Sequence, residues 1–89
     1  MKFLCSAIKF TPKDGSQMIV YGRRHCNCLD QMYKMKINRD KSKDIQGFII
    51  LIDSFETFVD RYCGAQFAKE LGYKLEHEDC LFSEDIWPE

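Results

Sequence analysis

The sequence predicts an α+β fold in which two β-hairpins form one antiparallel sheet and two helices pack against it. In each half of the chain, two short segments rich in β-branched and aromatic residues are separated by a turn. Each pair is followed by a segment whose apolar residues recur at helical spacing. The resulting order, β-β-α-β-β-α, is typical of antiparallel sheets with helices on one face.

The first hairpin is predicted over residues 3–11 and 17–21. Its first strand is rich in Phe, Ile and Thr, and Pro12-Lys13-Asp14-Gly15 has the composition of a tight turn. A helix is predicted over 27–36, with Asn27 as its N-cap. The residues that indicate the helical period are Leu29, Met32, Tyr33 and Lys36.

The second half begins after a segment without apolar residues, 38–44, for which we expect a solvated loop. Residues 46–52 are almost continuously apolar and β-branched, which predicts a central strand. Asp53-Ser54 turns the chain into a further strand over 55–59.

A second helix is predicted over 61–71. Asp60 is a suitable N-cap and Gly72 a suitable C′ residue. Its apolar stripe is expected to contain Cys63 or Gly64, Phe67, Ala68 and Leu71. The tail beyond Tyr73 contains too many apolar residues for free coil.

Length and composition restrict the classes of protein. A chain of 89 residues forms a single domain, 1–89, because it cannot divide into two cores. With 13 basic against 14 acidic residues, the net charge of −1 argues against duplex nucleic acid as a partner. The basic residues nevertheless concentrate at 34–43 and the acidic ones at 76–89.

Five cysteines, an odd number, follow no secretory signal, and no apolar run approaches the length of a membrane span. We therefore expect free thiols and a location in the cytoplasm, away from any membrane.

One face of the predicted sheet lacks a cover. The run 48–52 is apolar in both directions, and residues 3–10 have apolar side chains on both sides of the strand. Two helices cannot bury both faces of a sheet, so we expect a second copy of the chain to cover the remainder as a homodimer.

Two junctions between a strand and a helix predict an anion-binding site. Gly22-Arg23-Arg24-His25 precedes the first helix, and Phe58-Val59-Asp60-Arg61 precedes the second. Guanidinium groups and free N–H groups at helix starts both favour anions. The structural alternative is that an arginine pairs with the acidic tail and that Asp60 serves only as a cap.

The candidates for metal binding and catalysis are weaker. His25, Cys26, His77 and Cys80 include zinc-type ligands, but their spacing is not a familiar one. Cys28 and Cys63 are more typical of small core residues. No nucleophile elbow, phosphate-binding loop or paired-carboxylate motif is present. We therefore expect neither a metal, nor a cofactor, nor catalytic residues, and hence no enzyme.

Several blocks resemble small bacteriophage accessory proteins. The blocks are Ala7-Ile8-Lys9-Phe10, Gly22-Arg23-Arg24-His25, Gln46-Gly47-Phe48, Phe58-Val59-Asp60-Arg61 with Ala65 and Ala68, and Leu81-Phe82-Ser83-Glu84-Asp85-Ile86-Trp87. Their layout is similar to that of the phage Thoeris anti-defence proteins, which bind immune signals of the cyclic ADP-ribose type without degrading them. Glu56-Thr57 departs from that pattern, where a Gly-Arg pair is common.

The resemblance implies a sponge for a cyclic nucleotide or another molecule derived from ADP-ribose. Its two phosphates would contact Arg24 and Arg61, its adenine would lie against Phe48, and a ribose hydroxyl would bond to Asp60. The residues alone also allow Arg23, Arg24 and His25 to clamp a phosphate together. The alternative is a protein-binding phage inhibitor, similar to an anti-CRISPR, whose acidic surface mimics nucleic acid and blocks a host defence complex.

Overall fold

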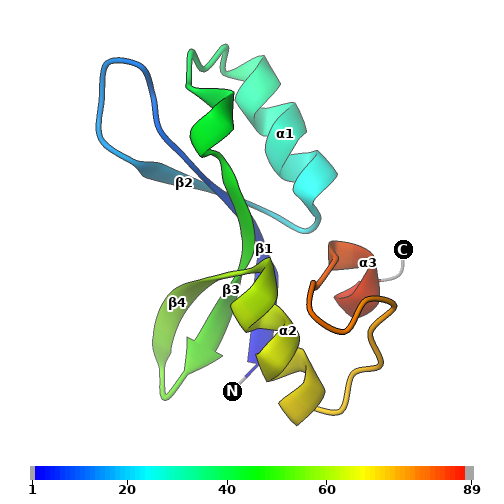
Figure 1. Cartoon of the computed structure of the whole chain (residues 1–89). Coiled ribbons are helices and arrows are strands. Elements are labelled where there is room, and N and C mark those ends of the chain that lie inside the picture. The colour runs from blue at the N-terminus through cyan, green and yellow to red at the C-terminus, as the bar shows by residue number, and fades with distance from the viewer. Residues whose placement is uncertain (1, 88–89) are drawn as a thin grey trace.

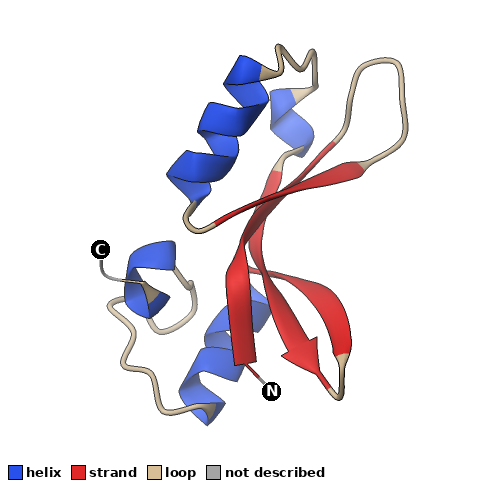
Figure 2. Cartoon of the chain, turned by 180° about the vertical axis from the view of Figure 1, so that it is seen from behind, coloured by secondary structure: helices blue, strands red, loops and turns tan. Residues whose placement is uncertain are grey.

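A four-stranded antiparallel sheet forms the centre of the protein, and two main helices lie on one of its faces (Figures 1 and 2). The computed structural model describes residues 2–87. Met1 of the predicted domain and Pro88-Glu89 of the predicted acidic tail lie outside this range. The strands are β1 (Lys2–Phe10), β2 (Met18–Gly22), β3 (Ile45–Ile52) and β4 (Phe55–Asp60), in the spatial order β2-β1-β3-β4. The predicted fold class is confirmed.

Both predicted hairpins are present, and β3 is central as expected. β1 pairs with β2 on one side and with β3 on the other, all antiparallel, with an irregularity between Phe3 and Cys5. Asp53 and Ser54 join β3 to β4 with φ values of 47° and 72°. Two consecutive residues with positive φ are what a tight hairpin turn requires.

Helix α1 (His25–Lys34) begins two residues earlier than predicted. Asn27 is therefore not the N-cap. It lies one turn inside the helix, where its Oδ1 accepts a hydrogen bond from the Arg24 backbone N–H at 3.0 Å. Asn27 thus caps the helix from a position inside its first turn instead of preceding it. This explains the difference between the predicted and the observed start of the helix.

The buried face of α1 also differs from the predicted stripe. His25, Cys28 and Met32 are buried, whereas Leu29 and Tyr33 are 41% and 83% exposed. The apolar residues of this short helix would allow either of two faces to be buried. Packing against β1 and β2 buries the face that contains His25 and Cys28. Cys28 is therefore a core residue, as predicted.

Helix α2 (Arg61–Glu70) agrees closely with its prediction. Asp60 Oδ1 accepts a hydrogen bond from the Cys63 N–H at 2.8 Å, and Gly72, with φ of 90°, follows the helix end. The buried residues are Gly64, Ala65 and Ala68, while Cys63 is exposed. The prediction of Cys63 as a core residue is thus wrong, because its neighbour Gly64 takes the inward position.

The segment 38–44 is more ordered than a solvated loop. Arg39 forms a bridge with Pro12, and Arg39 Nε lies 2.9 Å from Asp44 Oδ2, with both side chains largely buried. A short 3-10 helix, η1 (Lys41–Lys43), lies between the two. The expectation of a solvated loop holds for Asn38 and Lys41–Lys43, which are exposed, but not for Arg39 and Asp44, whose ion pair is largely buried.

The core consists of two clusters on the helix-covered face. One joins Ile8, Phe10 and Val20 to Cys28 and Met32 of α1. The other joins Phe48, Ile50 and Val59 to the small residues of α2 and to Leu81 of the tail. The tail ends in helix α3 (Ser83–Ile86), which lies between α1 and α2 in both views (Figures 1 and 2).

The other face of the sheet has no helix over it within residues 2–87. Ile19, Tyr21 and Ile45 share this face by register and are 37%, 52% and 39% exposed. Nearer the middle, the Phe58 ring covers Gly47, and Lys9 Nζ lies 4.6 Å from the centre of that ring. Association of two copies over this face stays a prediction.

Candidate functional site

The two predicted anion-binding junctions meet at the middle of the sheet. His25 Nε2 lies 2.8 Å from the carbonyl oxygen of Gly47, and Gly47 is the strand partner of Asp60. The start of α1 is therefore close to the start of α2. The sequence predicted both junctions, and the sheet register brings them together.

The C-terminal segment fills the space between these junctions. Arg24 Nε and Nη2 donate to the carbonyl oxygen of Trp87 at 3.0 and 2.6 Å. The guanidinium of Arg61 lies 4.7 Å from the centre of the Phe82 ring. Ser83 Oγ lies 3.4 Å from His25 Nδ1. Both arginines therefore contact the protein's own tail.

The remaining predicted residues have different surroundings. Phe48 has no exposed surface and packs against the rings of Phe3, His25 and Trp87, so no face of its ring is open to an adenine. Arg23 is exposed. Asp60 caps α2 and, with Arg61, lines a cavity of about 500 Å³.

Burial lowers the pKa of His25, and the nearby positive charge of Arg61 acts in the same direction, against the hydrogen bond to Gly47. The imidazole is thus neutral at neutral pH. A neutral ring buried in this way contributes little charge for an anion and serves instead as a hydrogen-bonded core group.

Three of the five thiols, those of Cys5, Cys28 and Cys63, are poorly suited to nucleophilic chemistry. Burial raises the pKa of Cys5, and it raises that of Cys28 to about 11. The carboxylate of Asp60 raises the pKa of Cys63. These thiols are protonated at neutral pH, whereas a nucleophile or metal ligand must be a thiolate. Across residues 2–87, no three metal-ligating side chains come together.

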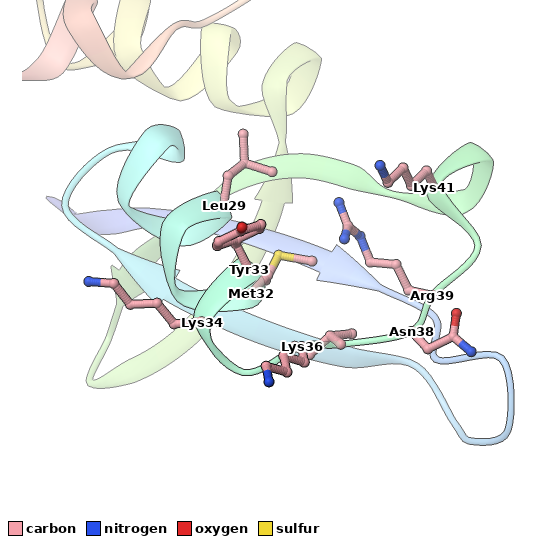
Figure 3. Close-up of a pocket in the computed structure, with 9 residues that line it drawn as sticks. Leu29, Met32, Tyr33, Lys34, Lys36, Asn38, Arg39 and Lys41 are labelled. Carbon is pink, nitrogen blue, oxygen red and sulfur yellow. The ribbon is translucent and has the colours of Figure 1, made fainter.

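A basic pocket of about 720 Å³ lies between α1 and the segment that follows it (Figure 3). Figure 3 shows Tyr33 and Arg39 on opposite sides of the cavity, with Lys34 directed away from it. The volume is in the range of small-molecule sites. The residues that line it, and define the name, are Leu29, Met32, Tyr33, Lys34, Lys36, Ile37, Asn38, Arg39 and Lys41.

The charges of the basic pocket are only partly neutralised. Lys34 pairs with Asp30 at 3.0 Å, and Arg39 pairs with Asp44. Lys36 and Lys41 have no ion-pair partner in the described part of the chain. The lining itself contains no carboxylate. Two uncompensated cations beside an 83% exposed tyrosine make a surface that attracts an anion with an aromatic ring.

The backbone at Lys36 is unusual. Its φ of 54° is the left-handed conformation that normally favours Gly or Asn at a helix end. The Lys36 N–H donates to Tyr33 O at 3.0 Å and the Ile37 N–H to Met32 O at 3.2 Å, which fixes this turn. A lysine therefore occupies the rim of the basic pocket at a position where glycine would be less strained.

The sequence contained one signal for this site. The cluster of basic residues at 34–43 was visible, but the absence of apolar residues in 38–44 favoured a solvated loop. The pocket depends on the docking of Arg39 against Pro12 and on the outward register of Leu29 and Tyr33. Neither this docking nor the orientation of the helix can be inferred from a local sequence pattern.

The fold and the basic pocket define a small α+β protein with a concave cationic surface. Comparison with family models identifies the family: residues 2–87 match the model described as Phage T4 y16D protein, and the chain belongs to this family. It is thus a member of a phage protein family, as the resemblance predicted in general terms. Neither the curated proteins nor the solved structures include a match. Within residues 2–87, no helix is both long and apolar enough to span a membrane.

Replacing Arg24 with Ala is expected to loosen the C-terminal segment. It removes two charge-assisted hydrogen bonds to Trp87, so the free energy of unfolding should fall by about 1.5–3 kcal/mol in urea titration. Arg23→Ala is the matched control, because the Arg23 side chain is exposed and the bond from Ser6 reaches only its backbone. Equal losses in both variants would contradict the role of Arg24.

Acidification from pH 7.5 to 5.5 is expected to destabilise the protein through His25. The unfolded chain takes up a proton near pH 6.5, whereas the folded chain resists it because its pKa is lowered. The stabilising contribution of neutral His25 to the free energy of unfolding is thus complete above pH 6.5. It is lost as the pH falls below 6.5. Urea titrations should show this slope, and His25→Gln should flatten it while His77→Gln retains it. A stability that rises on acidification would refute the neutral imidazole.

Proposed function

We propose that this phage protein binds and sequesters an anionic, nucleotide-type signal in the host cytoplasm without hydrolysing it. The observation that carries the proposal is the basic pocket, with its two uncompensated lysines and exposed tyrosine. Membership of a phage protein family supports a role in the interaction between phage and host. The finer proposal is a cyclic ADP-ribose type of signal of the Thoeris defence.

Sequestration fits the chemistry of the pocket better than catalysis does. Its lining contains amines, a guanidinium, an amide and a phenol, with no imidazole, thiol or carboxylate to act as base or nucleophile. A phosphate would lie between Lys36 and Lys41, and a base would stack on Tyr33. The proposal therefore moves the anion site from the junctions at Arg24 and Arg61, which contact the C-terminal segment, to the far end of α1.

Nucleotide binding predicts an increase in melting temperature. A panel of cyclic dinucleotides and ADP-ribose isomers should include a member that raises the melting temperature by several degrees, because a ligand of the native state stabilises it by mass action. Lys36→Glu and Lys41→Glu should abolish the rise, since both reverse a charge at the pocket.

The control for this experiment is Lys74→Glu, an exposed lysine outside the pocket, which should keep the full rise. If no member of the panel changes the melting temperature, the proposal fails. An effect on host defence that is insensitive to nucleotide but lost on charge reversal of Glu84 and Asp85 would favour the protein-binding inhibitor.

We also propose that a second copy covers the open face of the sheet. The face has Lys9 beside Ile19 and Ile45 at one end, and Glu56 beside Leu51 at the other. A two-fold axis perpendicular to the strands would bring the lysine end of one copy against the glutamate end of its partner.

Sedimentation velocity at micromolar concentration should give a dimer. Ile19→Lys should convert it to monomer, because the new charge would be buried on association. The exposed Leu29→Lys, on the other side of the molecule, is the control and should remain dimeric. A wild-type monomer under these conditions would remove the proposal.

A further inference from the structure

A second cavity adjoins the basic pocket. It has a volume of about 500 Å³ and lies where η1 and the start of β3 approach the junction of β4 and α2. Lys41 lines both cavities, so its side chain forms part of the wall that they share. We call this second space the arginine cavity, after Arg61, which lines it together with Tyr62, Asp44 and Asp60.

The arginine cavity shares an exposed tyrosine and a cation without an ion pair with the basic pocket, but it also contains the carboxylates of Asp44 and Asp60. Tyr62 is 66% exposed and Tyr33 in the basic pocket is 83% exposed, and each tyrosine lies in a cavity with a cation that forms no ion pair within residues 2–87. That cation is Lys36 in one cavity and Arg61 in the other. Each compartment therefore offers one aromatic surface and one positive charge.

Arg61 has unused hydrogen-bonding capacity. Its Nε is buried without a partner, and no ion pair or side-chain hydrogen bond involves it within residues 2–87. One face of its guanidinium packs on the Phe82 ring, which holds the group in place. The two acids of the cavity are engaged, because Asp44 pairs with Arg39 and Asp60 accepts from the Cys63 N–H. Neither carboxylate forms an ion pair with Arg61 within residues 2–87, so its guanidinium keeps N–H groups for a ligand, while the charge of Asp60 offsets part of its positive charge.

We infer that the two cavities form one site for a ligand with two planar rings joined by phosphates, that is, a dinucleotide. This inference rests on the proposed function and deepens it. The phosphates lie at Lys41, which reaches both cavities, with Lys36 and Arg61 on either side of them. The two bases stack on Tyr33 and Tyr62. A mononucleotide fills one cavity, whereas a dinucleotide occupies both and gains the second stacking surface and Arg61.

Titration calorimetry with AMP and the linear dinucleotide pApA tests this inference. Wild-type protein should bind pApA roughly tenfold more tightly than AMP or better, because the second base adds a stacking contact. Tyr62→Ala and Arg61→Ala should reduce pApA affinity toward that of AMP. Tyr33→Ala and Lys41→Ala should weaken the binding of both compounds.

The variants distinguish the two-cavity site from binding at the basic pocket alone. Tyr62 is mostly exposed, so Tyr62→Ala should fold, and circular dichroism melting would verify this. Lys69→Ala on the exposed surface of α2 is the matched control and should bind both compounds like wild type. If AMP binds through Lys36 and Lys41 but pApA is no tighter and Tyr62→Ala has no effect, the two-cavity site is wrong and the single pocket stands. If neither compound binds, the two-cavity site is wrong, and the melting panel alone decides whether the basic pocket binds a nucleotide.

Discussion

The buried imidazole of His25 joins the three parts of this fold. It begins α1, and its Nε2 lies at hydrogen-bonding distance from the carbonyl oxygen of Gly47 on β3, so it ties the first β-β-α half to the second. Its other nitrogen faces Ser83 of the tail, and its ring packs edge-on against Phe48. In a chain of this size the core is small, and one satisfied polar group at its centre fixes the position of several elements at once.

Gly47 makes this arrangement possible. A Cβ there would collide with the Val59 carbonyl oxygen and with the Phe58 ring. The close approach lets the ring of Phe58 lie over β3 on the open face, while the carbonyl of Gly47 faces the imidazole on the other side. The same position thus serves both faces of the sheet, and the C-terminal segment then closes over the helix-covered face with Arg24 and Arg61 as its contacts.

The tail contacts both junction arginines, and the cations without an ion pair in the described part of the chain lie around the two cavities. Lys36 and Lys41 line the basic pocket, and Arg61 lines the arginine cavity together with Lys41, with its buried Nε lacking a hydrogen-bond partner. The protein has almost no net charge, yet the lining of the basic pocket contains four basic residues and no carboxylate. The proposed binding of an anionic ligand relies on this local excess of positive charge.

The sequence by itself determined the order and type of the main elements, since alternation, turn residues, the Asp60 cap and Gly72 are local signals that act within a few residues. It also indicated the two arginine junctions and the basic cluster at 34–43. Only the tertiary structure decided which face of α1 is buried, that 38–44 docks through Arg39 and Asp44, and that Phe48 is enclosed by the tail. These outcomes depend on contacts between separate elements, whose energies no local pattern contains, and the first two of them shape the basic pocket.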